Sequence, residues 1–238
     1  MENYSNVLMY GAIAPIALLL GGIVSILKKP NVQVRSAILH FAAGVIFSVV
    51  SVEILPEIMA KHDVPEIAIG FGAGVLLMLG IRYFLEPQKE QKKETGFPTA
   101  FILVIAIDLL IDGVLMGIGF VTNQETGIFL AVAISVELLS LGMATSITLG
   151  NANINRKKII FTILGLSILV FGSTLLSAAL LAGVSTGFLE IILAFGLAAL
   201  LYLVTEELLV EAHESKQNIW LTAAFFGGFL LFMLLPGG

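Results

Sequence analysis

Three carboxylates stand in the middle of long apolar segments. Asp108 and Asp112 lie in the segment 98–121, and Glu137 lies in the segment 127–149. The i, i+4 spacing puts both aspartates on one face of a helix. At about 1.5 Å per residue, the distance of each acid from the end of its segment places all three at a similar depth. We therefore expect the three carboxylates to meet between two antiparallel helices.

The negative charge of these acids must be compensated inside the membrane. An ionised aspartate at the centre of a membrane helix costs on the order of 3 kcal/mol, and neighbouring negative charges also repel each other. No Lys or Arg lies in the central part of any predicted span, and Arg82 stands near the end of one, so an internal salt bridge is not expected. A bound cation, bound protons or a water-filled cavity could each compensate the charge. A purely structural alternative is that the acids are protonated and hydrogen-bond between helices.

Carboxylate oxygens are hard ligands, and the second segment adds hydroxyls. Ser135, Ser140 and Thr145 could serve as further ligands or hold water. Such a set suits Mg²⁺, Mn²⁺ or Ca²⁺ better than it suits metals that prefer thiolates, although Zn²⁺ and Fe²⁺ also accept carboxylates. The chain has no cysteine, which excludes thiolate ligands and disulfides. The sequence predicts a divalent cation as the substrate and leaves the element open.

Further acids stand near the ends of the apolar segments. The polar positions run from one membrane face through the centre to the other, as a cation pathway requires. An outer mouth is predicted at Glu53 and Glu57 in SVEILPE, with Glu190 nearby. EELLVEAHE supplies Glu206, Glu207, Glu211, His213 and Glu214, and from this stretch the inner mouth is predicted at Glu207, Glu211 and His213. The alternative is that these interfacial acids are only solvated; His40 stays ambiguous and His62 is given no role.

The composition requires membrane helices to position these residues. Hydrophobic residues make up 58% of the 238 positions and charged residues 12%, with a mean hydropathy of +1.04, which excludes a water-soluble surface for most of the chain. A helix needs about 20 apolar residues to cross the hydrocarbon. We predict an all-α, polytopic membrane protein in a lipid bilayer, with one transmembrane domain over 1–238 and no nucleic-acid partner. About eight helices are expected, at approximately 8–27, 36–60, 67–85, 98–121, 127–149, 159–182, 187–210 and 218–235.

The basic residues predict the orientation. Eleven of the twelve Lys and Arg residues fall on one side of the predicted spans, and only Lys61 falls on the other. Because cytoplasmic loops carry the excess of Lys and Arg, both termini are expected outside the cytoplasm, in a plasma or inner membrane. The charge-dense stretch Glu86–Gly96 is interpreted as a solvated cytoplasmic loop. The first apolar run follows an acidic start and has no small-residue cleavage site, so it is expected to be a retained helix.

Several segments resemble a known family. HFAAGVIFSVVSVEILPE (His40–Glu57) and LAFGLAALLYLVTEELLVEAHE (Leu193–Glu214) resemble the AAG…LxPE and LAFxAGxMxYVxxEELxPEAHE segments of the ZIP (Zrt/Irt-like) family of divalent metal transporters. FFGGFLLFM (Phe225–Met233) is similar to the family's glycine-rich last helix. The resemblance covers nearly all of the chain. It implies a bundle of three, two and three helices, with metal bound between the fourth and fifth and with extracellular termini.

The chain departs from the family pattern at the metal centre. DLLIDG stands at the family's HNxPEG, with Asp108 at the His position and Asp112 at the Glu position. AISVELLSLGMA aligns with a QNxPEG-like segment, with Glu137 at the Gln, Leu138 at the Asn and Leu141 at the bridging Glu. GLSILVFGSTLL in the next segment lacks the family's acid. The resemblance therefore implies at most one metal site, made only of oxygen ligands, which argues against zinc.

Three functions compete at this point. The first is transport of divalent metal cations into the cytoplasm by alternating access. The second keeps the fold for a proton or monovalent-cation pathway, or for a non-transporting, ZIP-like binding protein. The third, an intramembrane protease, has little support, because the chain has no GxGD, HExxH or EExxxR segment; we expect that the protein is not an enzyme. Gly113 and Gly117 form a GxxxG spacing, which favours packing inside the bundle and leaves a homodimer open.

Overall fold

The prediction of an all-α, polytopic membrane protein is confirmed. The computed structural model describes residues 2–28, 30–61, 63–90, 97–213 and 218–234, and in these ranges it holds helices and no strands. Seven helical stretches in the described ranges are long and apolar enough to cross a membrane: Ser5–Leu27, Val32–Ala60, Val64–Tyr83, Thr99–Thr122, Gln124–Asn151, Arg156–Leu181 and Thr186–His213. The predicted eighth span is also helical but covers only the 15 residues Ile219–Met233, which reach about 22 Å.

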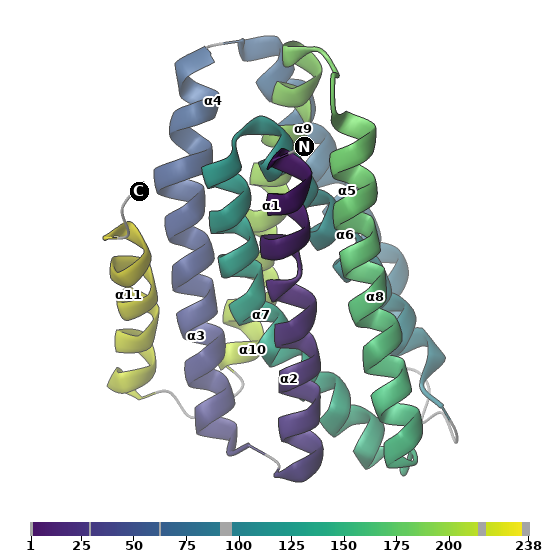
Figure 1. Cartoon of the computed structure of the whole chain (residues 1–238). Helices are drawn as coiled ribbons and strands as arrows, with labels where there is room; N and C mark the ends of the chain where they lie inside the picture. Colours follow the sequence, from purple (N-terminus) through teal and green to yellow (C-terminus); the bar gives the residue numbers. More distant parts are fainter. Residues whose placement is uncertain (1, 29, 62, 91–96, 214–217, 235–238) are drawn as a thin grey trace.

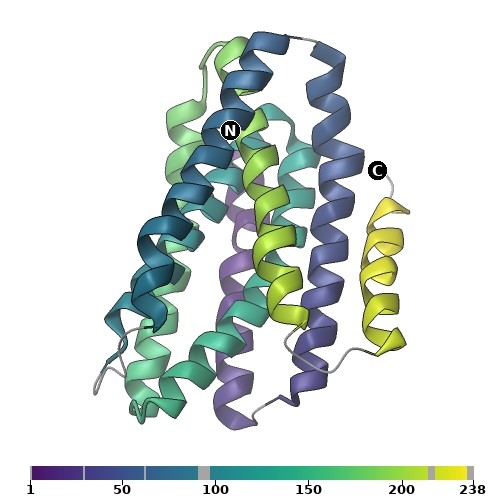
Figure 2. The same cartoon turned by 180° about the vertical axis from the view of Figure 1, so that it is seen from behind.

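The helices pack side by side in a single bundle (Figures 1 and 2). Two of the long stretches contain a short π-helical segment, named η1 and η2. In chain order the elements are α1 Glu2–Gly11, α2 Ile13–Leu27, α3 Val32–Val49, η1 Val50–Ile54, α4 Leu55–Lys61, α5 Val64–Glu90, α6 Thr99–Thr122, α7 Gln124–Asn151, α8 Arg156–Leu181, α9 Thr186–Tyr202, η2 Leu203–Leu208, α10 Leu209–His213 and α11 Ile219–Met233.

Asparagine caps fix the starts of three long helices. The side chains of Asn31, Asn123 and Asn155 accept hydrogen bonds from backbone N–H groups in the first turns of α3, α7 and α8. These N–H groups have no partner inside the helix, so the cap replaces the water that they would otherwise need. The cap at Asn123 also makes the connection between α6 and α7 very short. The two helices that carry the three central acids are therefore antiparallel neighbours.

Glycines allow the closest helix contacts. A Cβ atom at Gly142 of α7 would lie 2.2 Å from the backbone oxygen of Leu18 in α2. Cβ atoms at Gly113 and Gly117 of α6 would lie 1.7 and 1.8 Å from the hydroxyls of Ser173 and Ser177 in α8. Lipid gives helices no hydrophobic reason to associate, so close backbone approach supplies the packing. The GxxxG face of α6 is thus occupied by α8 within the chain.

The basic connections gather at one end of the bundle, which we call the basic end. The connections from α2 to α3 and from α7 to α8 lie there, at the bottom of Figure 1, as do the end of α5 and the start of α6. The α4–α5, α6–α7 and α8–α9 connections lie at the opposite end. The described chain begins and ends in the upper half of the same view. The assignment of the basic end to the cytoplasm stays a prediction.

The predicted loop Glu86–Gly96 is partly helical. α5 continues to Glu90 and so runs through Pro87, although a proline inside a helix removes one backbone hydrogen bond. Residues 91–96 lie outside the described residues. Glu214 of the predicted inner-mouth stretch also lies outside them, since α10 ends at His213.

Candidate metal site

The structure brings the three central acids together. Asp108 and Asp112 project from α6, Glu137 projects from α7, and one carboxylate oxygen of each lies within 4.8 Å of the others. We call these three residues the acid cluster. Asp112 is 2% exposed and Glu137 3% exposed, whereas Asp108 is half-buried. The antiparallel arrangement at Asn123 and the i, i+4 spacing on α6 produce this convergence, as the depth count predicted.

Two oxygens of the acid cluster have no protein partner. Asp112 Oδ2 and Glu137 Oε2 are buried and make no hydrogen bond within the part of the chain that the structure describes. A buried carboxylate without a partner is unfavourable, and in lipid no bulk water replaces the lost hydration. A cation, a proton or an ordered water must therefore interact with these two carboxylate oxygens to compensate for the lost hydration. Their proximity means that a single cation could satisfy both.

The hydroxyls of α7 are mostly engaged with its own backbone. Ser135 donates to the carbonyl oxygen of Ala131, and Thr145 donates to that of Leu141 at 2.7 Å. Ser140 Oγ is buried and has no hydrogen-bond partner among the described residues. Of the three hydroxyls that the sequence suggested as extra ligands, Ser140 is the one whose donor is not already used.

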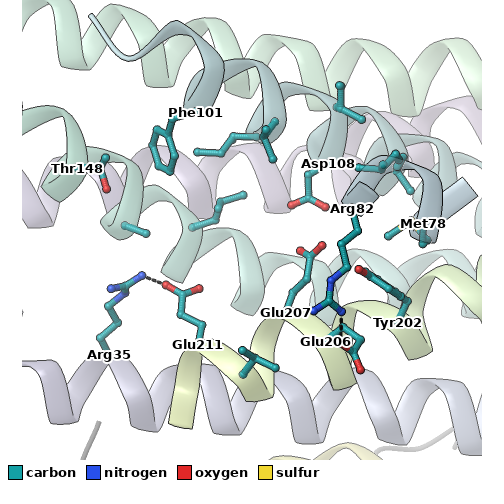
Figure 3. A pocket seen from close by; sticks show the side chains of 18 residues that line it. Arg35, Met78, Arg82, Phe101, Asp108, Thr148, Tyr202, Glu206, Glu207 and Glu211 are labelled. Carbon is teal, nitrogen blue, oxygen red and sulfur yellow. Dashed lines mark hydrogen bonds and ion pairs between the residues drawn. The ribbon is translucent and has the colours of Figure 1, made fainter. Parts of the chain in front are cut away.

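A cavity of about 450 Å³ reaches the acid cluster at Asp108 (Figure 3). Its wall comes from α3, α5, α6, α7 and the stretch that runs from α9 through η2 to α10. Phe101 and Thr148 mark its far part, and they lie at the end of α6 and α7 that faces the basic end. Asp112 and Glu137 do not line the cavity. Asp108 is therefore the member of the cluster that joins the buried carboxylates to this space.

Two arginines line the cavity, which sequence reasoning missed. Arg82 of α5 pairs with Glu206 of η2, and Arg35 of α3 pairs with Glu211 of α10 (Figure 3). These two ion pairs join glutamates of the cavity wall and not the central acids, for which the sequence expected no internal salt bridge. Both arginines stand near the ends of their helices in the sequence. Long side chains let them reach back along the helix, and which glutamate they meet depends on packing between distant helices, which spacing does not reveal.

The predicted inner-mouth residues divide into two groups. Glu207 and Glu211 line the cavity. His213 does not; its ring centroid lies 5.3 Å from that of the buried His40. Each imidazole has Nδ1 at the carbonyl oxygen four residues earlier, that of Ser36 for His40 at 2.8 Å and that of Leu209 for His213. The structure therefore places His213 beside His40 and outside the wall of the cavity.

The predicted outer-mouth residues lie away from the acid cluster. Glu53 belongs to η1 and Glu57 to α4, toward the end opposite the basic end, and both are half-buried. Glu53 Oε1 is buried and lacks a hydrogen-bond partner among the described residues. Glu190, at the start of α9, is 6% exposed. The structure places these acids in η1, α4 and α9, and their role at an outer mouth stays a prediction.

Both acidic motifs contain a π-helical segment. η1 includes Glu53, and η2 includes Glu206 and Glu207. A π turn holds one more residue than an α turn, so it changes the direction in which the following side chains point, and such segments are frequent at functional sites. The hydrophobic period of the sequence does not show them. Because the π-helical segments contain these acids, the directions of the acidic side chains in both motifs depend on irregular backbone.

No protein-family model matches the chain, and no curated protein matches it. The resemblance to ZIP transporters therefore rests on the motifs quoted above. What the structure adds is independent of that resemblance: membrane-length helices around a buried carboxylate cluster, an arrangement compatible with a membrane transporter.

Proposed function

We propose that the chain is a ZIP-like membrane transporter that moves divalent metal cations into the cytoplasm. Asp108, Asp112 and Glu137 form its transport site. The observation that carries the proposal is the convergence of three carboxylate oxygens within 4.8 Å on two membrane-length helices. Two of these groups hold a buried oxygen that has no hydrogen-bond partner among the described residues, and a bound cation would be such a partner.

The spacing of the acid cluster suits one cation. Oxygen ligands lie about 2.0–2.6 Å from Mg²⁺, Ca²⁺ or Zn²⁺, so the ligands of one ion fall within about 5 Å of each other. Three carboxylates would also offset the charge of a divalent ion, and Ser140 or water could complete its coordination. The donor set contains only oxygen. Mg²⁺, Mn²⁺ and Ca²⁺ are therefore the preferred substrates of this proposal, and Fe²⁺ and Zn²⁺ fit the set less well.

The cavity supplies one half of an alternating-access path. It runs from Asp108 toward the basic end, which the charge bias of the loops assigns to the cytoplasm. In this reading the structure is open to the inside, and a cation leaves the acid cluster through the cavity past Glu207 and Glu211. Glu53 and Glu57 would attract cations at the opposite end. Entry from that end requires a second conformation in which the cavity is closed.

Uptake into proteoliposomes tests the proposal. Purified protein is reconstituted, and accumulation of Mn²⁺, Mg²⁺, Ca²⁺, Fe²⁺ and Zn²⁺ is measured for wild type and for Asp108→Asn, Asp112→Asn and Glu137→Gln. Each variant keeps the size of the side chain but removes its charge, so uptake of the transported ion should fall by at least about tenfold. Asp63→Asn, at an exposed acid between α4 and α5, is the matched control and should transport like wild type. Equal uptake by wild type and all three variants for every ion would refute the proposal.

A proton pathway is the second candidate, because protons would also satisfy the buried oxygens of Asp112 and Glu137. Two neighbouring carboxyl groups can share a proton when their charges repel each other. The same vesicles distinguish the two functions. A flux that follows a pH gradient in the presence of a metal chelator, and that Glu137→Gln abolishes, would favour the proton pathway over metal transport.

A further inference from the structure

One wall of the cavity is acidic, and two of its glutamates form ion pairs with arginines. Glu206, Glu207 and Glu211 lie within six consecutive positions of η2 and α10, and all three line the cavity together with Asp108. Figure 3 shows the carboxylate of Glu207 between Asp108 and the paired Glu206. A cation that leaves the acid cluster by this route must pass a second set of carboxylates as rich in oxygen as the first.

We propose that Arg35 and Arg82 limit the number of divalent cations that this cavity holds. They act as tethered cations that hold Glu211 and Glu206 and so prevent a second divalent-cation site from forming on the wall. The proposal rests on the proposed function, since it concerns the path by which the ion would leave. It assigns the two arginines a role in ion number and release and not in ion binding.

The chemistry of the pairs supports this role. A guanidinium stays charged at any physiological pH, and its planar fork matches a carboxylate. Because Arg82 and Glu206 belong to helices of one chain, the guanidinium stays near the carboxylate at a high effective concentration, whereas a free metal ion arrives only in proportion to its concentration. The same holds for Arg35 and Glu211. A passing divalent ion must therefore displace an arginine before it can use either glutamate as a ligand.

The arrangement of the pairs also supports it. The two glutamates on either side of Glu207 in the sequence each meet an arginine from a different helix, Arg82 from α5 and Arg35 from α3. The lining residues include four acids and two arginines, so the arginines cancel half of the acidic charge of the wall. Without them, Glu206, Glu207 and Asp108 would present a carboxylate set next to the acid cluster, and their combined negative charge would attract and retain the ion.

The test counts bound ions. Mn²⁺ is titrated into the full-length protein in detergent, free Mn²⁺ is followed by its electron paramagnetic resonance signal, and release is timed after addition of excess chelator. Arg82→Gln should bind one more Mn²⁺ per chain than wild type and release it at least about tenfold more slowly. Arg82→Lys, which keeps a tethered charge, should behave like wild type. So should the double variant Arg82→Gln/Glu206→Gln, in which the uncovered carboxylate is also removed.

Arg35→Gln and Arg35→Gln/Glu211→Gln repeat the experiment at the other pair, so the proposal stays testable if one arginine is needed for folding. A gain of one ion in either single variant, lost again in its double variant, supports the proposal. Wild-type stoichiometry and release in both single variants overturn it. The readout is the difference from wild type. If wild type binds no Mn²⁺, the proposed transport site fails, while the gain or absence of an ion in the arginine variants still decides this inference.

Discussion

At the scale of single residues, the three members of the acid cluster are not equivalent. Asp112 and Glu137 are buried, and each has an oxygen without a hydrogen-bond partner in the part of the chain that the structure describes, whereas Asp108 lines the cavity. If the acid cluster binds a cation as proposed, an ion from the cavity would meet Asp108 first, and Asp112 and Glu137 would complete the coordination of that ion. Exchange of the ion would then depend on Asp108, and its retention on Asp112 and Glu137. This difference separates the effects of the three substitutions on binding.

Thermal unfolding in detergent should show the division. A ligand at about 100 times its dissociation constant stabilises a protein by about 2.7 kcal/mol, so Mn²⁺ should raise the unfolding temperature of wild type. Glu137→Gln should abolish the increase, and without metal it should unfold no earlier than wild type, because it removes an uncompensated buried carboxylate. Asp63→Asn should keep the full increase. An undiminished effect of Mn²⁺ on Glu137→Gln would contradict the site.

The acid cluster could be predicted because it depends only on the spacing of residues along two helices that are consecutive in the sequence. The positions of Asp108, Asp112 and Glu137 follow from the rise of a helix and the short connection at Asn123, both visible in the sequence. The partners of Arg35 and Arg82 were not predictable. They depend on the packing of α3 and α5 against η2 and α10, elements far apart in the chain, and no periodicity records that packing.

At the scale of elements, glycine contacts decide which helices pair. Gly142 of α7 faces the backbone of α2, where a Cβ would lie 2.2 Å from the oxygen of Leu18. The opposite case is Gly172 of α8, which has open space around it. The contact at Gly142 fixes the spacing between α2 and the helix that carries Glu137. The π segments η1 and η2 act at the same scale, since they set the direction of the acids, and the sequence pattern did not reveal them.

These two glycines form a matched pair for a stability test. Gly142→Ala forces α2 and α7 apart, and we expect a loss of about 1–3 kcal/mol in the free energy of unfolding, as for overpacking of a tight contact. Gly172→Ala should leave stability unchanged or raise it by about 0.5–1 kcal/mol, because alanine favours a helix more than glycine does. Unfolding temperatures in one detergent give the comparison. Equal stability of both variants would argue against the α2–α7 contact.

At the scale of the whole molecule, one cavity lies between the acid cluster and the basic end of the bundle. The helices that carry the acid cluster, α6 and α7, pack with α2 and α8, while the acidic stretch of the wall belongs to η2 and α10, which pack against α3 (Figures 1 and 2). Because α6 and α7 also line the cavity, this acidic stretch and the helices of the acid cluster enclose the same space. In the proposed transport cycle, a shift of η2 and α10 relative to α6 and α7 would separate Asp108 from the acidic stretch.

The orientation of the whole molecule can be measured directly, because the chain has no cysteine and a single introduced one is the only thiol. Thr148 lines the cavity, and Glu125 is exposed at the opposite end of α7. We expect a membrane-impermeant maleimide to label Thr148→Cys only from the cytoplasmic side and Glu125→Cys only from the outside. Saturating Mn²⁺ should slow labelling of Thr148→Cys if the ion favours a conformation with the cavity closed. Labelling of Thr148→Cys from the outside would reverse the orientation, since the cavity would then deliver ions outward, and the positive charges of the loops would no longer predict the direction of transport.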